Sequence, residues 1–226
     1  MKKPIGIHTL VLPLLILGYG CSTGSGNLLV NGNAEAPKYD SMPKGWQNIS
    51  GMWISLEGDS THHDYGFAKE GKYYFFGGNG LLCVLQQDAD VQQYANRIDD
   101  GKQRFFVNGS ERSLDQGQLS DQGMLKFECL DVTKTKILYS DSTDTLMSIG
   151  KWRAIADTFS APKFTRYVRV QLIAFRHVGG DNDGYFDDIS LTAFPSPNYS
   201  LVIIIVAVIL AIIVGVIVCF SKKSKK

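Results

Sequence analysis

The sequence predicts an all-β fold, an antiparallel β-sandwich or jelly roll, followed by a C-terminal transmembrane helix. Apolar and polar residues alternate along several short segments, which is the period of a strand with one buried face. Clusters of Gly, Asn and Asp separate these segments and favour turns. About eight to ten short strands at this spacing are typical of a sandwich or jelly roll. A long apolar run near the C-terminus predicts the helix.

The clearest predicted strands are residues 125–129 and 168–174, where apolar residues alternate with charged or amide residues. The other strand candidates are rich in apolar and aromatic residues: 72–76, 81–85, 105–107, 152–159 and 186–193. The expected turns all contain Gly: 77–80, 108–109, 121–123 and 179–184. Residues 88–97 carry apolar side chains at helical spacing and form the one predicted helical or loop insert.

Residues 1–20 are typical of a secretory signal peptide, because two Lys residues precede an apolar run that ends in small residues. Cys21 is also placed as in a bacterial lipoprotein, where the thiol receives lipid before cleavage. The bulky Tyr19 departs from that pattern, so lipidation of Cys21 and ordinary cleavage just before it both stay open. Residues 21–26 then form a short linker.

Residues 200–220 contain no charged residue and are long enough to cross a hydrocarbon core about 30 Å thick. The basic tail, residues 221–226, is expected to stay in the cytoplasm, which places the domain before it outside the cytoplasm. We therefore predict a single-pass protein of the cell membrane, with residues 195–199 as a linker. Cleavage of this tail by a sorting enzyme is the alternative left open.

The charge of the exported part argues against nucleic-acid binding. The chain has 23 basic and 22 acidic residues, but residues 21–198 keep only 17 of the basic and all 22 acidic ones, a formal charge of −5. Neutralising phosphates needs a basic patch. The same segment has room for one ordinary domain, which excludes a large multidomain enzyme.

The exported part contains two cysteines, Cys83 and Cys129, each in an apolar strand-like run. A disulfide between them is one prediction, because a pair outside the cytoplasm oxidises when its geometry allows. Buried free thiols acting as small apolar side chains are the other.

The two ends of the domain resemble one known fold family. Residues 27–35 read Asn-Leu-Leu-Val-Asn-Gly-Asn-Ala-Glu and are followed by Gly45-Trp46, while residues 182–191 read Asn-Asp-Gly-Tyr-Phe-Asp-Asp-Ile-Ser-Leu. These segments resemble the opening and closing strands of galactose-binding-like jelly rolls, the fold of many carbohydrate-binding modules. The resemblance implies one such domain over residues 27–194.

The resemblance also implies a structural calcium ion between the two ends. By position, Glu35 and Asp187 would supply carboxylates and Asn33 a backbone carbonyl, all hard oxygen ligands that suit calcium. The alternative is that these residues are ordinary solvated or capping groups of turns.

A carbohydrate-binding module would stack an exposed aromatic side chain on the sugar and hydrogen-bond its hydroxyl groups. We expect Trp53 to be such a ligand-binding residue, because it follows a Gly in a polar loop. The weaker candidates lie in or beside loops: Tyr65, Tyr73, Tyr185, residues 62–64 and residues 176–177.

Catalytic motifs are not apparent: the four His residues stand in no hydrolase or metalloprotease pattern. We therefore expect a membrane-anchored, extracytoplasmic, non-catalytic module for carbohydrate or another cell-surface ligand. A structural envelope protein without a ligand pocket and a small glycan-acting hydrolase are the alternatives.

Overall fold

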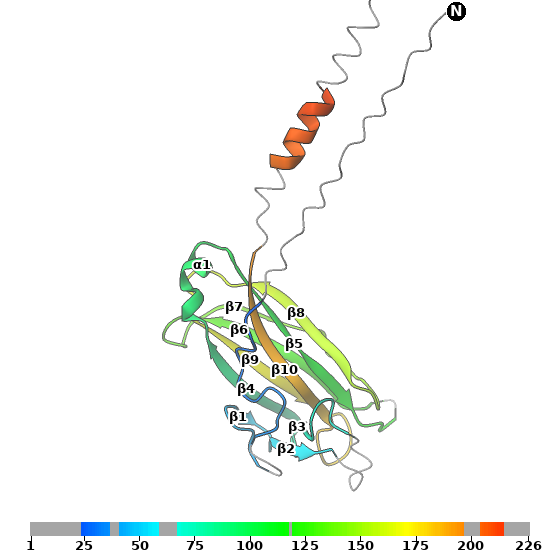
Figure 1. The fold of residues 1–226 in the computed structure, drawn as a ribbon. Coiled ribbons are helices and arrows are strands. Elements are labelled where there is room, and N and C mark those ends of the chain that lie inside the picture. Colours follow the sequence, from blue (N-terminus) through cyan, green and yellow to red (C-terminus); the bar gives the residue numbers. More distant parts are fainter. Residues whose placement is uncertain (1–23, 37–40, 59–66, 118, 197–203, 215–226) are drawn as a thin grey trace, which may run out of the picture.

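The computed structural model describes residues 24–36, 41–58, 67–117, 119–196 and 204–214 (Figure 1). Within these ranges ten strands form two five-stranded sheets. The first sheet has the order β1 (Gln47–Ser50), β4 (Leu82–Asp90), β9 (Tyr167–Phe175), β6 (Gln122–Leu130), β7 (Ile137–Ser142). The second has the order β2 (Ile54–Glu57), β3 (Tyr73–Phe76), β10 (Gly184–Pro195), β5 (Gln103–Ser113), β8 (Arg153–Ser160). Every pair of neighbouring strands is antiparallel.

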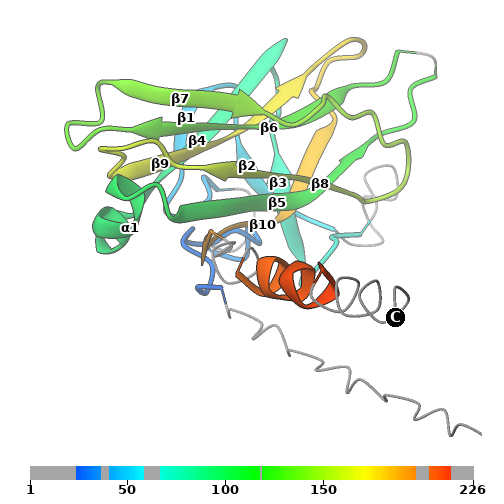
Figure 2. The ribbon, with the colours of Figure 1, turned by 90° about the horizontal axis from the view of Figure 1, so that it is seen from above.

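The two sheets lie face to face, as Figure 2 shows. The hydrophobic core lies between them. The inward side chains of β6 and β9 are fully buried, as the alternation in their sequences predicted. Aromatic rings join the two layers: Phe127 of β6 and Phe159 of β8 stack with centroids 4.4 Å apart. Within the second sheet, the ring of Phe105 stacks on Phe159 at 5.7 Å. The predicted antiparallel sandwich is therefore confirmed.

The predicted turn at Asn108 and Gly109 is wrong, because both residues lie inside β5. Gly109 is needed there for packing: a Cβ atom on it would lie 2.3 Å from Cδ1 of Ile189. Ile189 belongs to an irregular stretch of β10, where the register to β5 shifts between Asp187 and Ser190. A Gly inside a strand and a Gly in a turn look the same in the sequence.

The predicted insert at residues 88–97 begins too early. β4 continues to Asp90, and the helical part consists of η1 (Gln92–Tyr94) and α1 (Ala95–Asp99). The side chain of Asp90 accepts the amide N–H of Gln92 at 2.9 Å and so marks the change from strand to helix.

The opening segment lies along β10, as the resemblance predicted, although it forms no regular strand. The Asn27 side chain donates to the carbonyl of Ile189 at 2.9 Å and accepts the amide N–H of Leu191 at 3.0 Å. Backbone bonds from Ser25 to Ala193 and from Leu28 to Leu191 extend the contact. The two ends of the domain are thus held together.

The predicted disulfide is not formed, because Cys83 and Cys129 are free, buried thiols. Cys83 on β4 pairs with Ala174 of β9, and Cys129 on β6 pairs with Val168 of the same strand. These two positions are six residues apart along β9, which places the two thiols about 20 Å apart along the strand direction. A disulfide needs its Cα atoms within about 7 Å.

Residues 204–214 form a helix whose side chains are mostly exposed. Of the helices within the described ranges, none is long and apolar enough to span a membrane. The predicted signal peptide (residues 1–20), Cys21, and both flanks of the predicted transmembrane segment lie outside the described residues.

One end of the core contains a buried carboxyl group, Glu111 on β5. Its Oε1 atom accepts the hydroxyl of Ser113 at 2.8 Å, and its Oε2 atom has no hydrogen-bond partner among the described residues. Burial raises the pKa of Glu111 to about 8, although bonds from Ser113 and Ser148 partly oppose this. The carboxyl is therefore protonated at neutral pH.

We expect the free energy of unfolding to fall as the pH rises from 5 to 9. A carboxyl whose pKa is raised by folding stabilises the native state fully below its unfolded pKa, and this contribution is lost as the pH passes the folded value of about 8. Glu111→Gln should flatten the upper part of this profile, because the amide stays neutral, by an amount on the order of a few kcal/mol. Urea unfolding at several pH values measures it.

The matched control is Asp144→Asn, which changes an exposed carboxyl and should leave the profile unchanged. Asp183 and Asp187 also have raised pKa values, so a smaller slope between pH 5 and 7 should remain in Glu111→Gln. A profile with the same slope above pH 7 in the wild type and in Glu111→Gln would contradict the assignment.

Candidate ligand-binding face

The two sheets differ in how far their outer faces are covered. On the second sheet, Leu56, Tyr74, Phe76 and Tyr185 form a small outer cluster against which Trp152 and other side chains pack. The indole N–H of Trp152 donates to the carbonyl of Phe67 at 2.8 Å. This bond holds the Trp152 ring over the outer cluster of the second sheet. The outer face of the first sheet instead carries ordered polar side chains.

The outward side chains of β4, β9 and β6 form cross-strand rows, because β9 pairs with both neighbours in antiparallel register. The rows are Leu82–Phe175–Gln122, Val84–Ile173–Met124, Gln86–Gln171–Lys126, Asp88–Arg169–Glu128 and Asp90–Tyr167–Leu130. We call the third and fourth rows, together with Gln47 of β1, the polar face.

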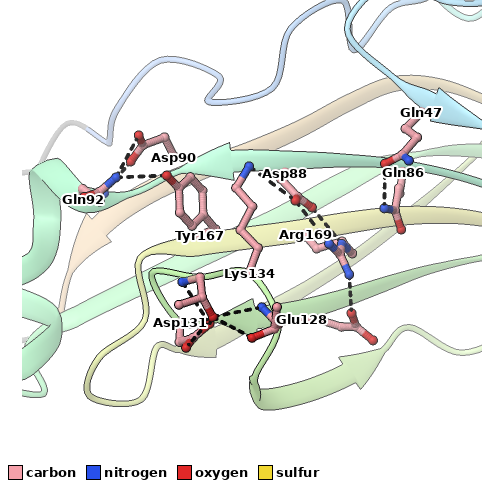
Figure 3. Close-up of polar contacts among 12 residues, drawn as sticks. Gln47, Gln86, Asp88, Asp90, Gln92, Glu128, Asp131, Lys134, Tyr167 and Arg169 are labelled. Atoms are coloured by element: carbon pink, nitrogen blue, oxygen red, sulfur yellow. Dashed lines mark hydrogen bonds and ion pairs between the residues drawn. The ribbon is translucent and has the colours of Figure 1, made fainter.

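Amide side chains form the first part of the polar face (Figure 3). The Gln171 amide donates to Oε1 of Gln86 at 3.0 Å, and the Gln86 amide donates to Oε1 of Gln47 at 3.1 Å. Each amide is oriented by its neighbour, and each has further donor and acceptor capacity. Gln86 is the most buried of the three and holds the centre of the chain of bonds.

Charged side chains form the second part, centred on Arg169. Its guanidinium donates two hydrogen bonds to Asp88, at 2.7 and 3.2 Å, and lies 3.6 Å from Glu128. Lys134 lies 3.6 Å from Asp88 (Figure 3). Lys126 bonds Glu128 at 2.7 Å. The bonds to Asp88 raise the pKa of Arg169 further above its ordinary value. A bidentate Arg–carboxylate contact fixes the relative orientation of the two side chains better than an ion pair with a single hydrogen bond.

An aromatic residue borders the charged row. The ammonium group of Lys134 lies 4.2 Å from the ring centroid of Tyr167, within the range of a cation–π contact. The hydroxyl of Tyr167 accepts the side-chain amide of Gln92 at 3.1 Å, and that amide also bonds Asp90. The other border is apolar, with Leu82 about half exposed beside Phe175.

This arrangement can recognise a flat, uncharged, polyhydroxylated molecule. Amide, carboxylate and guanidinium groups together offer donors and acceptors at fixed positions. Because the charged groups already pair with one another, a ligand would add hydrogen bonds without having to neutralise a charge. The apolar and aromatic borders can contact C–H surfaces.

The expectation that Trp53 offers an exposed ring is wrong. Trp53 is only 2% exposed, its indole N–H bonds the carbonyl of Ser50 at 3.0 Å, and its ring packs against Phe186. The side chain belongs to the core, because the polar loop around it turns it inward. Tyr73 and Tyr185 are also buried, and residues 62–65 lie outside the described residues.

Glu35 and Asp187, expected as calcium ligands, contact the same short segment. Oε1 of Glu35 accepts the amide N–H groups of Lys72 and Tyr73, at 2.7 and 2.8 Å. Oδ2 of Asp187 accepts those of Lys69 and Glu70, at 2.8 and 3.0 Å. Two carboxylates from opposite ends of the domain thus bind residues 69–73.

These contacts fit a cation only in part. Asp187 also accepts the amide of Asp188, so amide donors already use three of about four acceptor positions of its carboxylate. Among the described residues, no three His, Cys, Asp or Glu side chains form a metal-binding group. A polar cavity of about 280 Å³ lies beside this region, lined in part by Asn31, Asn33 and Asp188. Burial raises the pKa of Asp187 to about 7, partly opposed by the three amides.

The polar face was not found from the sequence, although part of its signal is visible there. The polar partners in the 168–174 alternation, Arg169 and Gln171, were interpreted only as the solvent side of a strand. Their neighbours Gln86, Asp88 and Glu128 come from strands far away in sequence, so the strand order was needed to bring them together.

No family model matches the chain, and no curated protein is found as a relative. Among solved structures, a cyclase from Fischerella sp. TAU covers 78% of this chain and 100% of its own, with 13% identity and a TM-score of 0.56. The Stig cyclase Fisc from the same source was solved in complex with (3Z)-3-(1-methyl-2-pyrrolidinylidene)-3H-indole. It covers 77% of this chain and 100% of its own, with 14% identity and a TM-score of 0.55. At this identity the likeness concerns the fold alone.

A family 61 carbohydrate-binding module in complex with β-1,4-galactotriose also aligns, over 74% of this chain and 98% of its own, with 13% identity and a TM-score of 0.47. A score below 0.5 adds nothing to the comparison of folds. The two antiparallel sheets and the paired ends of the domain form a galactose-binding-like β-sandwich, as the resemblance in the sequence predicted.

We expect Arg169→Met to lower the free energy of unfolding by about 1–3 kcal/mol, because Asp88 and the nearly buried Glu128 would lose their shared cation. Lys126→Met removes a more exposed cation beside the same Glu128 and should cost less than about 1 kcal/mol. Urea unfolding of both variants gives the comparison. Equal losses would show that Arg169 does not organise the charged row.

Proposed function

We propose that this chain is a membrane-anchored, extracytoplasmic, non-catalytic binding module that holds an uncharged glycan on the polar face. The observation that supports this best is the row of connected amides, Gln47, Gln86 and Gln171, beside the paired charges around Arg169. Such a face is pre-organised, so a ligand loses little free energy in ordering it.

The positions of the carboxyl groups with strongly raised pKa values support a non-catalytic role. The two with the largest upward pKa shifts are Glu111, inside the core, and Asp187, beneath residues 69–73. A general acid must reach the substrate. Neither group lies on the polar face, where Asp88 and Glu128 are occupied by Arg169.

The membrane anchor is supported by the sequence of residues 200–220 and by the chemistry of the described helix. The large side chains of residues 204–214 are all apolar, and most are about half exposed. A helix that is apolar on all sides belongs in a protein core or a membrane. With the basic tail in the cytoplasm, the sandwich lies outside the cell membrane. Lipidation of Cys21 stays a prediction.

The glycan-binding proposal can be tested on an array of neutral and acidic glycans with the full chain in detergent. We expect binding to neutral glycans. Gln86→Ala and Gln171→Ala should each weaken it about fivefold or more, because each removes hydrogen-bonding capacity worth about 1 kcal/mol. Gln93→Ala is the matched control, since this exposed Gln lies on η1, outside the polar face.

Two results would overturn this proposal. One is binding that survives both substitutions unchanged, which would place the ligand elsewhere. The other is no binding to any glycan, which would favour a structural envelope protein.

We also propose calcium as a structural ligand at Glu35, Asp187 and the carbonyl of Asn33. The two carboxylates converge on residues 69–73, which supports a shared cation there. The alternative is that the carboxylates only accept the backbone N–H groups of this segment. With chelator, lowering the pH from 8 to 5 should raise the melting temperature, because Asp187 takes up a proton at its pKa of about 7, in addition to the protons taken up by Glu111 and Asp183.

With calcium present, the melting temperature at pH 8 should rise by several degrees and the dependence on pH should weaken. Asp187→Asn should lose this calcium response. Identical melting curves with calcium and with chelator would mean that the two carboxylates act only as clamps for backbone amides.

A further inference from the structure

The chain leaves the sandwich at one defined end, which Figure 1 shows beside α1. The amide N–H of Ser196, the last described residue of the sandwich, bonds the carbonyl of Lys102 at 2.9 Å, in the loop that follows α1. The opening segment reaches the same end, since Ser25 bonds Ala193. Both ends of the domain are therefore fixed next to α1.

Only residues 197–199 stand between Ser196 and the apolar run that begins at residue 200. Three residues span at most about 10 Å. If residues 200–220 cross a bilayer, as proposed above, this end of the sandwich must lie at the membrane surface.

The same end differs in charge from the rest of the domain. The loops and strand ends that form it are residues 90–104, 131–136 and 161–166, which meet because Asp90, Leu130 and Tyr167 share one cross-strand row and Arg104 pairs with Ser160. These ranges contain seven basic and four acidic residues, a net charge of +3. Residues 21–198 as a whole carry −5.

An exposed aromatic ring stands among these charges. Phe164 is 67% exposed and has a φ of 71°, a left-handed conformation that is uncommon for a bulky residue. Its amide N–H bonds Asp99 of α1 at 2.8 Å, and Arg166 bonds both oxygens of the same Asp99, at 2.8 and 3.2 Å. The fold therefore holds a large apolar ring outward at a local cost in backbone strain.

We propose that this end of the domain rests on an anionic lipid surface, with Phe164 in the interfacial layer and the surrounding basic side chains against lipid phosphates. Aromatic rings favour the boundary between hydrocarbon and water, and basic residues near a bilayer are attracted to anionic headgroups. This inference depends on the proposed membrane anchor. It sets the orientation of the module, with the long axis of the sandwich pointing away from the bilayer.

The test uses the full chain reconstituted into vesicles of phosphatidylcholine and phosphatidylglycerol, with and without bromine on the acyl chains. Bromine quenches the fluorescence of Trp that lies at the membrane. Phe164→Trp places a new Trp at the proposed contact. Leu81→Trp is the control, because Leu81 is 71% exposed and lies beside the opposite end of β4. The wild type gives the signal of the three native Trp residues.

We expect the added emission of Phe164→Trp to be mostly lost in brominated vesicles and that of Leu81→Trp to be retained. Lys163→Glu, made in the Phe164→Trp background, should reduce the quenching, because it reverses a charge beside the ring. Lys151→Glu makes the same change before the far end of β8 and should have no effect.

Alkaline carbonate extraction separates two kinds of failure. Release of the chain from the vesicles would overturn the membrane anchor, and this inference with it. Retention of the chain with no more quenching of Phe164→Trp than of Leu81→Trp would leave the anchor in place and overturn the docking of this end. Equal quenching with Lys163→Glu and Lys151→Glu would contradict the role of anionic lipid.

Discussion

The strict alternation of β9 is the constraint on which both the core and the candidate site depend. Its inward residues, such as Val170 and Leu172, fill the space between the sheets, and its outward residues Arg169 and Gln171 form the centre of the polar face. A shift of one residue in its register would exchange the two sets. Burial of the apolar residues therefore also fixes the positions of Arg169 and Gln171, so the geometry of the face follows from the packing of the core.

Carboxyl groups that are buried or partly buried occur in three parts of the molecule, and their charge is compensated in a different way in each. On the polar face, the partly buried Asp88 and the nearly buried Glu128 are compensated by Arg169. At the junction of the domain ends, Glu35 and Asp187 are compensated by backbone amides of residues 69–73. In the core, burial raises the pKa of Glu111 to about 8 despite the opposing charge of Arg153, so the carboxyl is neutral at pH 7. Only the first arrangement leaves hydrogen-bonding groups for a ligand.

The sequence predicted the fold class well because burial acts on local patterns. The alternation in residues 125–129 and 168–174 and the motifs at both ends of the domain were enough for a galactose-binding-like sandwich. Pairing of distant strands was not visible. It separates Cys83 from Cys129 and places Gly109 against Ile189, so the predicted disulfide and turn were wrong. Trp53 was misplaced for a related reason, since a polar loop does not reveal which way its large side chain turns.

Binding of a neutral glycan to the polar face can be followed directly at its side-chain amides by nuclear magnetic resonance. Titration of the ¹⁵N-labelled protein with a neutral oligosaccharide should shift the NH₂ signals of Gln86 and Gln171 with one common affinity, while the signal of Gln93 stays fixed. Shifts confined to residues outside β4, β9 and β6, or no shifts at saturating oligosaccharide, would show that the polar face does not bind a neutral glycan.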